Sequence, residues 1–129
     1  MTEASTPTWA DGRAFEEYAA RFLSAKWGVE LSCRPVTLPG GVTKKFDLVT
    51  ADGRIVGDAK YYKNIAVPAA KWSTIAEYVW LLQHVPNAER RFMVFGLDIA
   101  VAARWLSRFR GWCEGVEFYF LDGETLQTL

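Results

Sequence analysis

Apolar side chains recur along the chain in two patterns, one with helical spacing and one in short runs typical of strands. The helical pattern predicts helices over residues 12–27, 68–85 and 99–110. The first is bounded by Asp11, a suitable N-cap, and by Gly28, a suitable residue after the last turn. The strand-like runs cover residues 29–36, 43–50, 54–62, 91–96 and 116–121. This order predicts an α/β protein, an αβββαβαβ sandwich with a mixed central sheet.

The second and third strand-like runs are separated by Ala51-Asp52-Gly53. An Asp-Gly pair between two such runs is typical of a two-residue type I′ turn, in which both central residues have positive φ. With Asp52 and Gly53 as the turn, Ala51 faces Arg54, and the pairing of the flanking residues follows. We therefore expect a tight hairpin with one defined register.

That register places Asp47 directly opposite Asp58. Because side chains of a strand alternate between faces, Asp47, Asp58 and Lys60 would share one face, and Phe46 and Ala59 the other. Two facing carboxylates repel each other. Lys60 would offset part of that charge, and a hard divalent cation such as Mg²⁺, which prefers oxygen ligands, would offset the rest. The alternative is an ordinary solvated hairpin face that carries a mixture of Asp and Lys.

The spacing of Asp47, ten further residues and then Asp58-Ala59-Lys60 resembles the signature of the PD-(D/E)XK nuclease superfamily. Its members have the restriction-endonuclease-like fold, whose element order matches the one predicted here over residues 12–121. Phe46 stands where the family has a proline. The resemblance implies Mg²⁺, or Mn²⁺ in its place, held by Asp47, Asp58 and the backbone carbonyl of Ala59. It also implies that Lys60 orients the attacking water and stabilises developing negative charge.

The first predicted helix carries a second resemblance. Its pattern Gly12-x₃-Glu16-x₂-Ala19-x₃-Leu23 is similar to that of several branches of the superfamily, archaeal Holliday-junction resolvases among them. In those branches the glutamate joins the metal site, which implies the same catalytic and metal-binding place for Glu16. Glu17, about 100° further round the helix, is the alternative. A third possibility is that both glutamates are solvated residues favoured by the helix dipole.

The formal net charge is zero, which argues against strong, indiscriminate attraction of nucleic acid. Basic residues nevertheless gather around the predicted hairpin, whereas the segment from Trp112 onward has acidic residues and no Lys or Arg. The residues predicted to contact nucleic acid are Lys44, Lys45, Tyr62, Lys63 and Lys71. DNA is the expected partner rather than RNA, and a homodimer or a partner protein would help a neutral chain to bind it.

The length of 129 residues predicts one domain over residues 11–129, preceded by a flexible tail over residues 1–10. No apolar run reaches the roughly 18 residues that cross a bilayer, and the first residues do not resemble a secretory signal. We therefore expect no membrane association and a cytoplasmic location. Cys33 and Cys113 lack CxxC spacing and are expected to be reduced, packed cysteines.

Together these features predict a Mg²⁺-dependent phosphodiesterase, a DNA endonuclease of repair, recombination or defence. The alternative is a catalytically inactive module of the same fold that binds nucleic acid or protein. A third interpretation is an unrelated α/β protein whose hairpin charges coincide by chance. Trp80 lies off the apolar stripe of the second predicted helix, and its exposure would indicate an interface.

Overall fold

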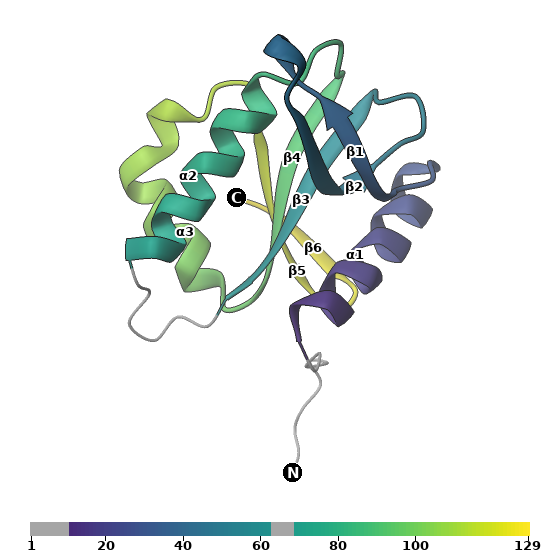
Figure 1. Ribbon diagram of the computed structural model, residues 1–129. Coiled ribbons are helices and arrows are strands. Elements are labelled where there is room, and N and C mark those ends of the chain that lie inside the picture. Colours follow the sequence, from purple (N-terminus) through teal and green to yellow (C-terminus); the bar gives the residue numbers. More distant parts are fainter. Residues whose placement is uncertain (1–10, 63–68) are drawn as a thin grey trace.

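A mixed six-stranded sheet forms the centre of the protein, and its strands lie side by side in chain order (Figure 1). The computed structural model describes residues 11–62 and 69–129. The strands are β1 (Ser32–Thr37), β2 (Thr43–Val49), β3 (Ile55–Tyr62), β4 (Arg90–Leu97), β5 (Glu117–Asp122) and β6 (Thr125–Thr128). β3, β4 and β5 are parallel, whereas β1, β2 and β6 run antiparallel to their neighbours. The predicted α/β class with a mixed sheet is therefore confirmed.

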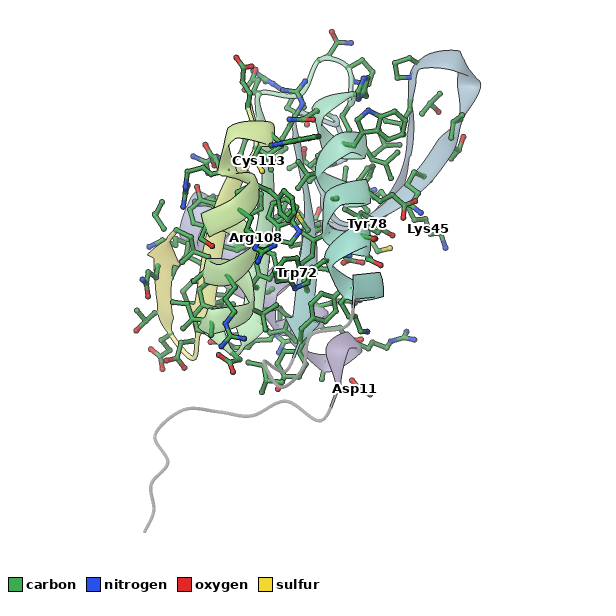
Figure 2. The ribbon with its side chains drawn as sticks, turned by 90° about the vertical axis from the view of Figure 1, so that its left-hand side faces the viewer. Asp11, Lys45, Trp72, Tyr78, Arg108 and Cys113 are labelled. Atoms are coloured by element: carbon green, nitrogen blue, oxygen red, sulfur yellow. The ribbon has the colours of Figure 1, made fainter. Side chains whose placement is uncertain are left out.

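Three helices cover the two faces of this sheet. α1 (Gly12–Trp27) packs on one face, and α2 (Ala69–Gln83) and α3 (Ile99–Phe109) pack together on the other, as Figures 1 and 2 show. Each face has its own cluster of buried apolar side chains, one around Phe15 of α1 and one around Trp105 of α3. Two short 3₁₀ helices, η1 (Pro39–Gly41) and η2 (Arg110–Trp112), complete the fold.

The ends of α1 and α3 follow from the residues that stand there. The carboxylate of Asp11 accepts a hydrogen bond of 2.9 Å from the N–H of Ala14, so Asp11 caps α1 as expected. Gly28 ends the same helix in the left-handed region, with φ of 67°, a conformation that glycine adopts without steric cost. Asp98 caps α3 in the same manner, through the N–H of Ala100.

The C-terminal strand β6 is a feature that the sequence analysis missed. It pairs with β5 through a two-residue connection, Gly123 and Glu124, between the paired residues Asp122 and Thr125. Gly123 has φ of 60°. β1 also differs from its prediction, because it begins at Ser32 rather than at residue 29.

Some predictions fall outside the described residues. These are the flexible tail over residues 1–10, Pro68 as the first residue of the second helix, and Lys63 as a contact to nucleic acid. Within the described ranges, no helix is long and apolar enough to cross a membrane.

The β2–β3 hairpin has the predicted register but not the predicted turn. Leu48 pairs with Gly57 and Val49 with Val56. The N–H of Thr50 then donates to the carbonyl of Ile55 at 3.1 Å, which leaves four residues, 51–54, in the loop. Among these only Gly53 has positive φ, so the type I′ turn is wrong.

Side chains explain why this loop is longer than two residues. The hydroxyl of Thr50 donates to the Asp52 carboxylate at 2.8 Å and accepts from the N–H of Ile55 at 3.1 Å. The same carboxylate accepts from the N–H of Arg54 at 3.1 Å. Polar side chains thus satisfy backbone groups that a tighter turn would pair directly. A four-residue loop has the same centre as the predicted two-residue turn, and for that reason the register is unchanged.

β2 contains an irregularity at the point where Asp47 lies. Ser32 of β1 pairs with Val49, whereas Arg34 pairs with Phe46, so two steps along β1 correspond to three along β2. The extra residue reverses the alternation of faces. As a result Phe46 packs in the cluster on the α2 and α3 face, while Ala59 belongs to the cluster under α1. The predicted placement of Phe46 and Ala59 on a common face is therefore wrong.

Candidate active site

Asp47 and Asp58 exchange hydrogen bonds between side chain and backbone just where the pairing of β2 with β3 ends. The N–H of Asp47 donates to Oδ1 of Asp58 at 3.2 Å, and the N–H of Ala59 donates to Oδ2 of Asp47 at 3.0 Å. Each carboxylate therefore reaches across to the opposite strand. The structure brings the two aspartates together, as the register predicts.

Asp58 is the more deeply buried of the two, with only 2 % of its surface exposed. Burial raises the pKa of its carboxyl group to about 7; the Lys60 ammonium opposes this rise and the Asp47 carboxylate adds to it. Oδ2 of Asp58 lies 2.6 Å from Nζ of Lys60. Asp58 thus contacts both Asp47 and Lys60. Asp47 borders a pocket under α1, whereas Lys60 contacts α2, so the prediction that all three side chains share one face is wrong.

Lys60 is itself 8 % exposed and has a second partner besides Asp58. Its ammonium nitrogen lies 3.6 Å from the centre of the Tyr78 ring, which α2 supplies. Burial on its own lowers the pKa of Lys60, but the Asp58 carboxylate reverses this effect and the net shift is upward. Lys60 therefore remains a cation inside the protein.

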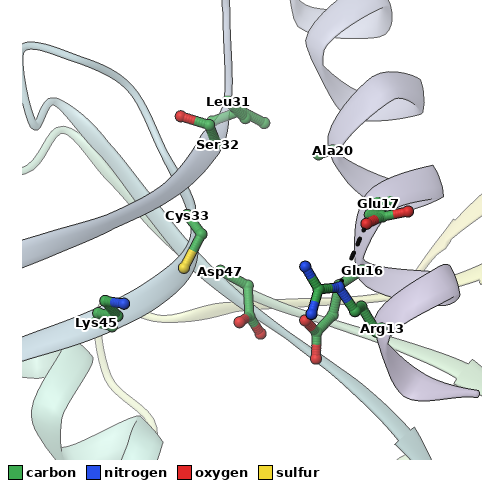
Figure 3. A pocket seen from close by; sticks show the side chains of 9 residues that line it. All are labelled: Arg13, Glu16, Glu17, Ala20, Leu31, Ser32, Cys33, Lys45 and Asp47. Atoms are coloured by element: carbon green, nitrogen blue, oxygen red, sulfur yellow. Dashed lines mark ion pairs between the residues drawn. The ribbon is translucent and has the colours of Figure 1, made fainter.

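On the α1 side, the side chain of Asp47 lines a pocket of about 580 Å³ between α1 and the strands β1 and β2 (Figure 3). The charged and sulfur-bearing side chains around it are Arg13, Glu16, Glu17, Cys33, Lys45 and Asp47. Cys33 is exposed there, which corrects the expectation that it is packed, whereas Cys113 is buried; neither forms a disulfide. The pocket gives solvent-borne ligands a route to the Asp47 carboxylate.

Glu16 and Glu17 have different surroundings in this pocket. Glu16 is half-buried, and its pKa is raised by burial first and by the Asp47 carboxylate second. Lys60 also acts on it, in the opposite direction. Glu17 is exposed and forms an ion pair of 3.5 Å with Arg13, away from Asp47 in Figure 3. The structure thus places Glu16, rather than Glu17, in the electrostatic field of the trio.

The residues predicted to contact nucleic acid lie on both sides of the trio. Lys45 lines the pocket under α1. On the other side, Nζ of Lys44 lies 4.9 Å from the centre of the Tyr78 ring, and Nζ of Lys71 lies 4.8 Å from that of Tyr62. These cations surround the carboxylates and give the site a mixed rather than a purely acidic character.

Tyr78 and Arg13 are the residues of this region that the sequence analysis overlooked. Tyr78 is partly buried at the edge of the stripe that includes Ile75, Val79 and Leu82, and an aromatic residue in that position was the available signal. Arg13 was one of several charged residues on α1, and no pattern in the sequence distinguished it.

A divalent cation fits the donor set, although the described residues contain no ready-made group of three His, Cys, Asp or Glu ligands. Two neighbouring carboxylates carry more negative charge than Lys60 balances, and the Asp47 carboxylate adds to the rise that burial causes in the pKa of Asp58. Carboxylate and carbonyl oxygens are the ligands that Mg²⁺ prefers. Asp47 and Asp58 would hold the ion, with the Ala59 carbonyl that the family resemblance implies and with Glu16 at its margin.

Comparison of the chain with protein-family models, with curated proteins and with solved structures finds no significant match. What supports a function is therefore the side-chain arrangement itself.

Proposed function

We propose that the protein is a metal-dependent nuclease of the PD-(D/E)XK type, with a restriction-endonuclease-like fold, that hydrolyses phosphodiester bonds in DNA. The observation that carries the proposal is the contact of Asp47, Asp58 and Lys60 at the open end of the β2–β3 hairpin. Glu16 faces the same place from α1. Such convergence of paired carboxylates with a buried lysine is costly for folding, and function accounts for its presence.

In this proposal the carboxylates of Asp47 and Asp58 and the carbonyl of Ala59 hold Mg²⁺ or Mn²⁺. When bound there, the ion would lower the pKa of a coordinated water and polarise the phosphoryl oxygen. Lys60, kept charged by Asp58, stabilises the negative charge that develops on the phosphate. Glu16 adds a carboxylate at the margin of the metal site, directly or through water.

Substrate binding would use the cations that flank the trio. Lys44, Lys45 and Lys71 present ammonium groups to phosphates, and Tyr62 offers an aromatic ring to a base or sugar. Because the net charge of the chain is zero, we propose that tight binding of DNA needs a second copy or a partner protein. Trp80, 61 % exposed on α2, marks one surface where such a contact would form.

One observation favours a second candidate, a nuclease-fold module that binds nucleic acid or protein without cleaving it. Asp58 and Lys60 are almost fully buried, and a buried ion pair can serve structure alone. The two candidates differ in what they require of the metal. Only the nuclease needs a divalent cation at the trio.

The test is cleavage of a panel of branched, duplex and single-stranded DNAs and of RNA, with Mg²⁺, with Mn²⁺ and with a chelator. The Asp47→Ala variant, purified in parallel, controls for a contaminating nuclease. Cleavage that requires the metal and is absent from Asp47→Ala supports the proposal. Binding of DNA without cleavage under any of these conditions favours the non-catalytic module.

A further inference from the structure

The Tyr78 ring lies next to two ammonium groups that come from different strands. Nζ of Lys60 in β3 is 3.6 Å from its centre and Nζ of Lys44 in β2 is 4.9 Å away. An aromatic face attracts a cation, and the attraction is strongest where water is excluded, as it is around Lys60. One side chain of α2 thus contacts the ammonium groups of both Lys60 and Lys44.

The position of this ring depends on the irregularity in β2. Phe46, which the extra residue in β2 turns toward α2, contacts Tyr78 edge to face with ring centres 6.2 Å apart. The backbone feature at Asp47 therefore also supports the ring that holds Lys60. Figure 2 shows Tyr78 on the side of α2 toward the β1–β2 edge, where Lys45 also lies.

Two ammonium groups beside one ring repel each other, and of these two it is Lys60 that forms an ion pair with Asp58. Lys44 is half-buried, and its ammonium group lies over the same ring. An anion with two or more oxygens that contacts both lysines would relieve this repulsion. The non-bridging oxygens of a phosphodiester have that chemistry.

We infer that Tyr78 is a positioning residue of this site, whose ring fixes Lys60 and Lys44 together as a binding place for the non-bridging oxygens of a phosphodiester. The inference rests on the proposed nuclease function for its kinetic consequences. Its structural consequence, that the ring and not the hydroxyl group holds the lysines, is independent of any activity.

The test compares Tyr78→Phe, which keeps the ring, with Tyr78→Leu, which removes it. In ¹H–¹³C NMR spectra the ε-methylene protons of Lys60 should be shifted upfield by the ring in the wild type and in Tyr78→Phe, and not in Tyr78→Leu. Addition of inorganic phosphate should move the ε signals of both lysines in the first two proteins and not in the third. Tyr78→Met, a large apolar replacement, substitutes for Tyr78→Leu if that variant does not fold.

The kinetic arm uses labelled DNA and Mg²⁺. Tyr78→Leu should lower kcat about thirtyfold, which corresponds to a cation–π contact in a desolvated site, and Tyr78→Phe should stay within about threefold of the wild type. Lys44→Ala should raise KM more than it lowers kcat. Lys26→Ala, which removes an exposed charge in the last turn of α1, is the matched control and should change neither.

Three results would overturn the inference: no ring shift on Lys60 in the wild type, equal losses in Tyr78→Phe and Tyr78→Leu, or full activity in a folded Tyr78→Leu protein. Failure of the proposed function is a different result, namely no cleavage by the wild type. In that case the NMR arm still decides, because the ring shift and the phosphate response need no turnover.

Discussion

Two aspartates of the same hairpin, Asp52 in its loop and Asp58 in strand β3, accept similar hydrogen bonds yet have opposite pKa shifts. Asp52 accepts from the N–H of Arg54 and from the hydroxyl of Thr50, and these bonds lower the pKa of its carboxyl group. Asp58 accepts from the N–H of Asp47 and from Lys60, yet burial raises its pKa to about 7. The difference between them is access to water.

The comparison shows what each end of the hairpin contributes. In the loop a charged carboxylate is hydrated and bonded, so its charge stabilises the fold. At the open end the charge of Asp58 is unfavourable, and the fold tolerates it because Lys60 and backbone donors surround it. A group that is costly when ionised and lies beside another carboxylate is suited to bind a cation, whereas Asp52 is suited only to hold the loop.

The largest expected effect is on catalysis. Asp58→Ala should lower kcat/KM for DNA cleavage in Mg²⁺ roughly a thousandfold, because the metal loses one of its two carboxylates. Asp52→Ala, in the same hairpin, should cleave at the wild-type rate and is the matched control. Circular dichroism and the Tm of each variant establish that it is folded. A folded Asp58→Ala protein with activity close to that of Asp52→Ala would exclude Asp58 from the site.

The second effect is on stability and has a defined sign with pH. The pKa of Asp58 is higher in the folded than in the unfolded protein. Between these two pKa values the folded state binds more protons than the unfolded state, so the protein loses stability as pH rises. Relative to Asp58→Asn, the wild type should lose about 3 kcal/mol of unfolding free energy between about pH 5 and pH 8 in a chelator. In Asp58→Asn, Lys60 lacks its carboxylate partner at every pH. The cost of this loss is constant, so it does not contribute to the change of the difference with pH.

Urea unfolding of both proteins at several pH values measures this difference. Mg²⁺ should reduce the loss in the wild type and leave the variant unchanged, because an ion that binds only the folded state stabilises it. A difference between the two proteins that is independent of pH would show that the Asp58 carboxylate is ionised throughout, like that of Asp52.

The hairpin register could be predicted from the sequence, and the loop could not. Asp52-Gly53 locates the centre of the hairpin, and any symmetric loop about that centre pairs Leu48 with Gly57. The loop length depends on the hydroxyl of Thr50, whose hydrogen bonds are specific to the folded geometry. The two-residue connection occurs instead at Gly123-Glu124, and its glycine belongs to the pair Asp122-Gly123, which was not recognised as a turn signal.

The proximity of Asp47, Asp58 and Lys60 and the orientation of Glu16 could be predicted because each follows from a local pattern, the hairpin register or a helix face. Tyr78 could not, because its role depends on contacts between α2 and two strands that are distant in sequence. The irregularity in β2 is also invisible in the sequence, since it appears only in the pairing with β1. Local periodicity therefore predicts the acidic part of the site, and tertiary packing determines how the lysines are held.

The third prediction concerns α1. Glu16→Gln should raise the Mg²⁺ concentration for half-maximal activity about tenfold, as is typical when a group next to the metal ligands is neutralised. Glu17→Gln should have less than a twofold effect, because Glu17 is exposed and pairs with Arg13. The measurement is the Mg²⁺ dependence of cleavage for the two variants side by side. A larger effect from Glu17→Gln would show that Glu16 is not the metal-site glutamate and that the wrong face of α1 has been assigned to the site.

The smallest effect is expected at the loop, where Asp52 stabilises the fold through hydrogen bonds that water partly replaces. Asp52→Ala should lower Tm slightly at neutral pH, and Asp52→Asn, which keeps an acceptor oxygen, should lower it less.

Because the pKa of Asp52 is lowered on folding, its contribution is present above the unfolded pKa and is lost as pH falls through the folded pKa. Wild type and Asp52→Ala should therefore converge in Tm in strong acid, opposite to the trend with Asp58. Amide exchange at Thr50 should remain slow in both variants, since the N–H of Thr50 still donates to the carbonyl of Ile55. Fast exchange there would mean that Asp52, and not the Thr50–Ile55 pairing, maintains the register that brings Asp47 to Asp58.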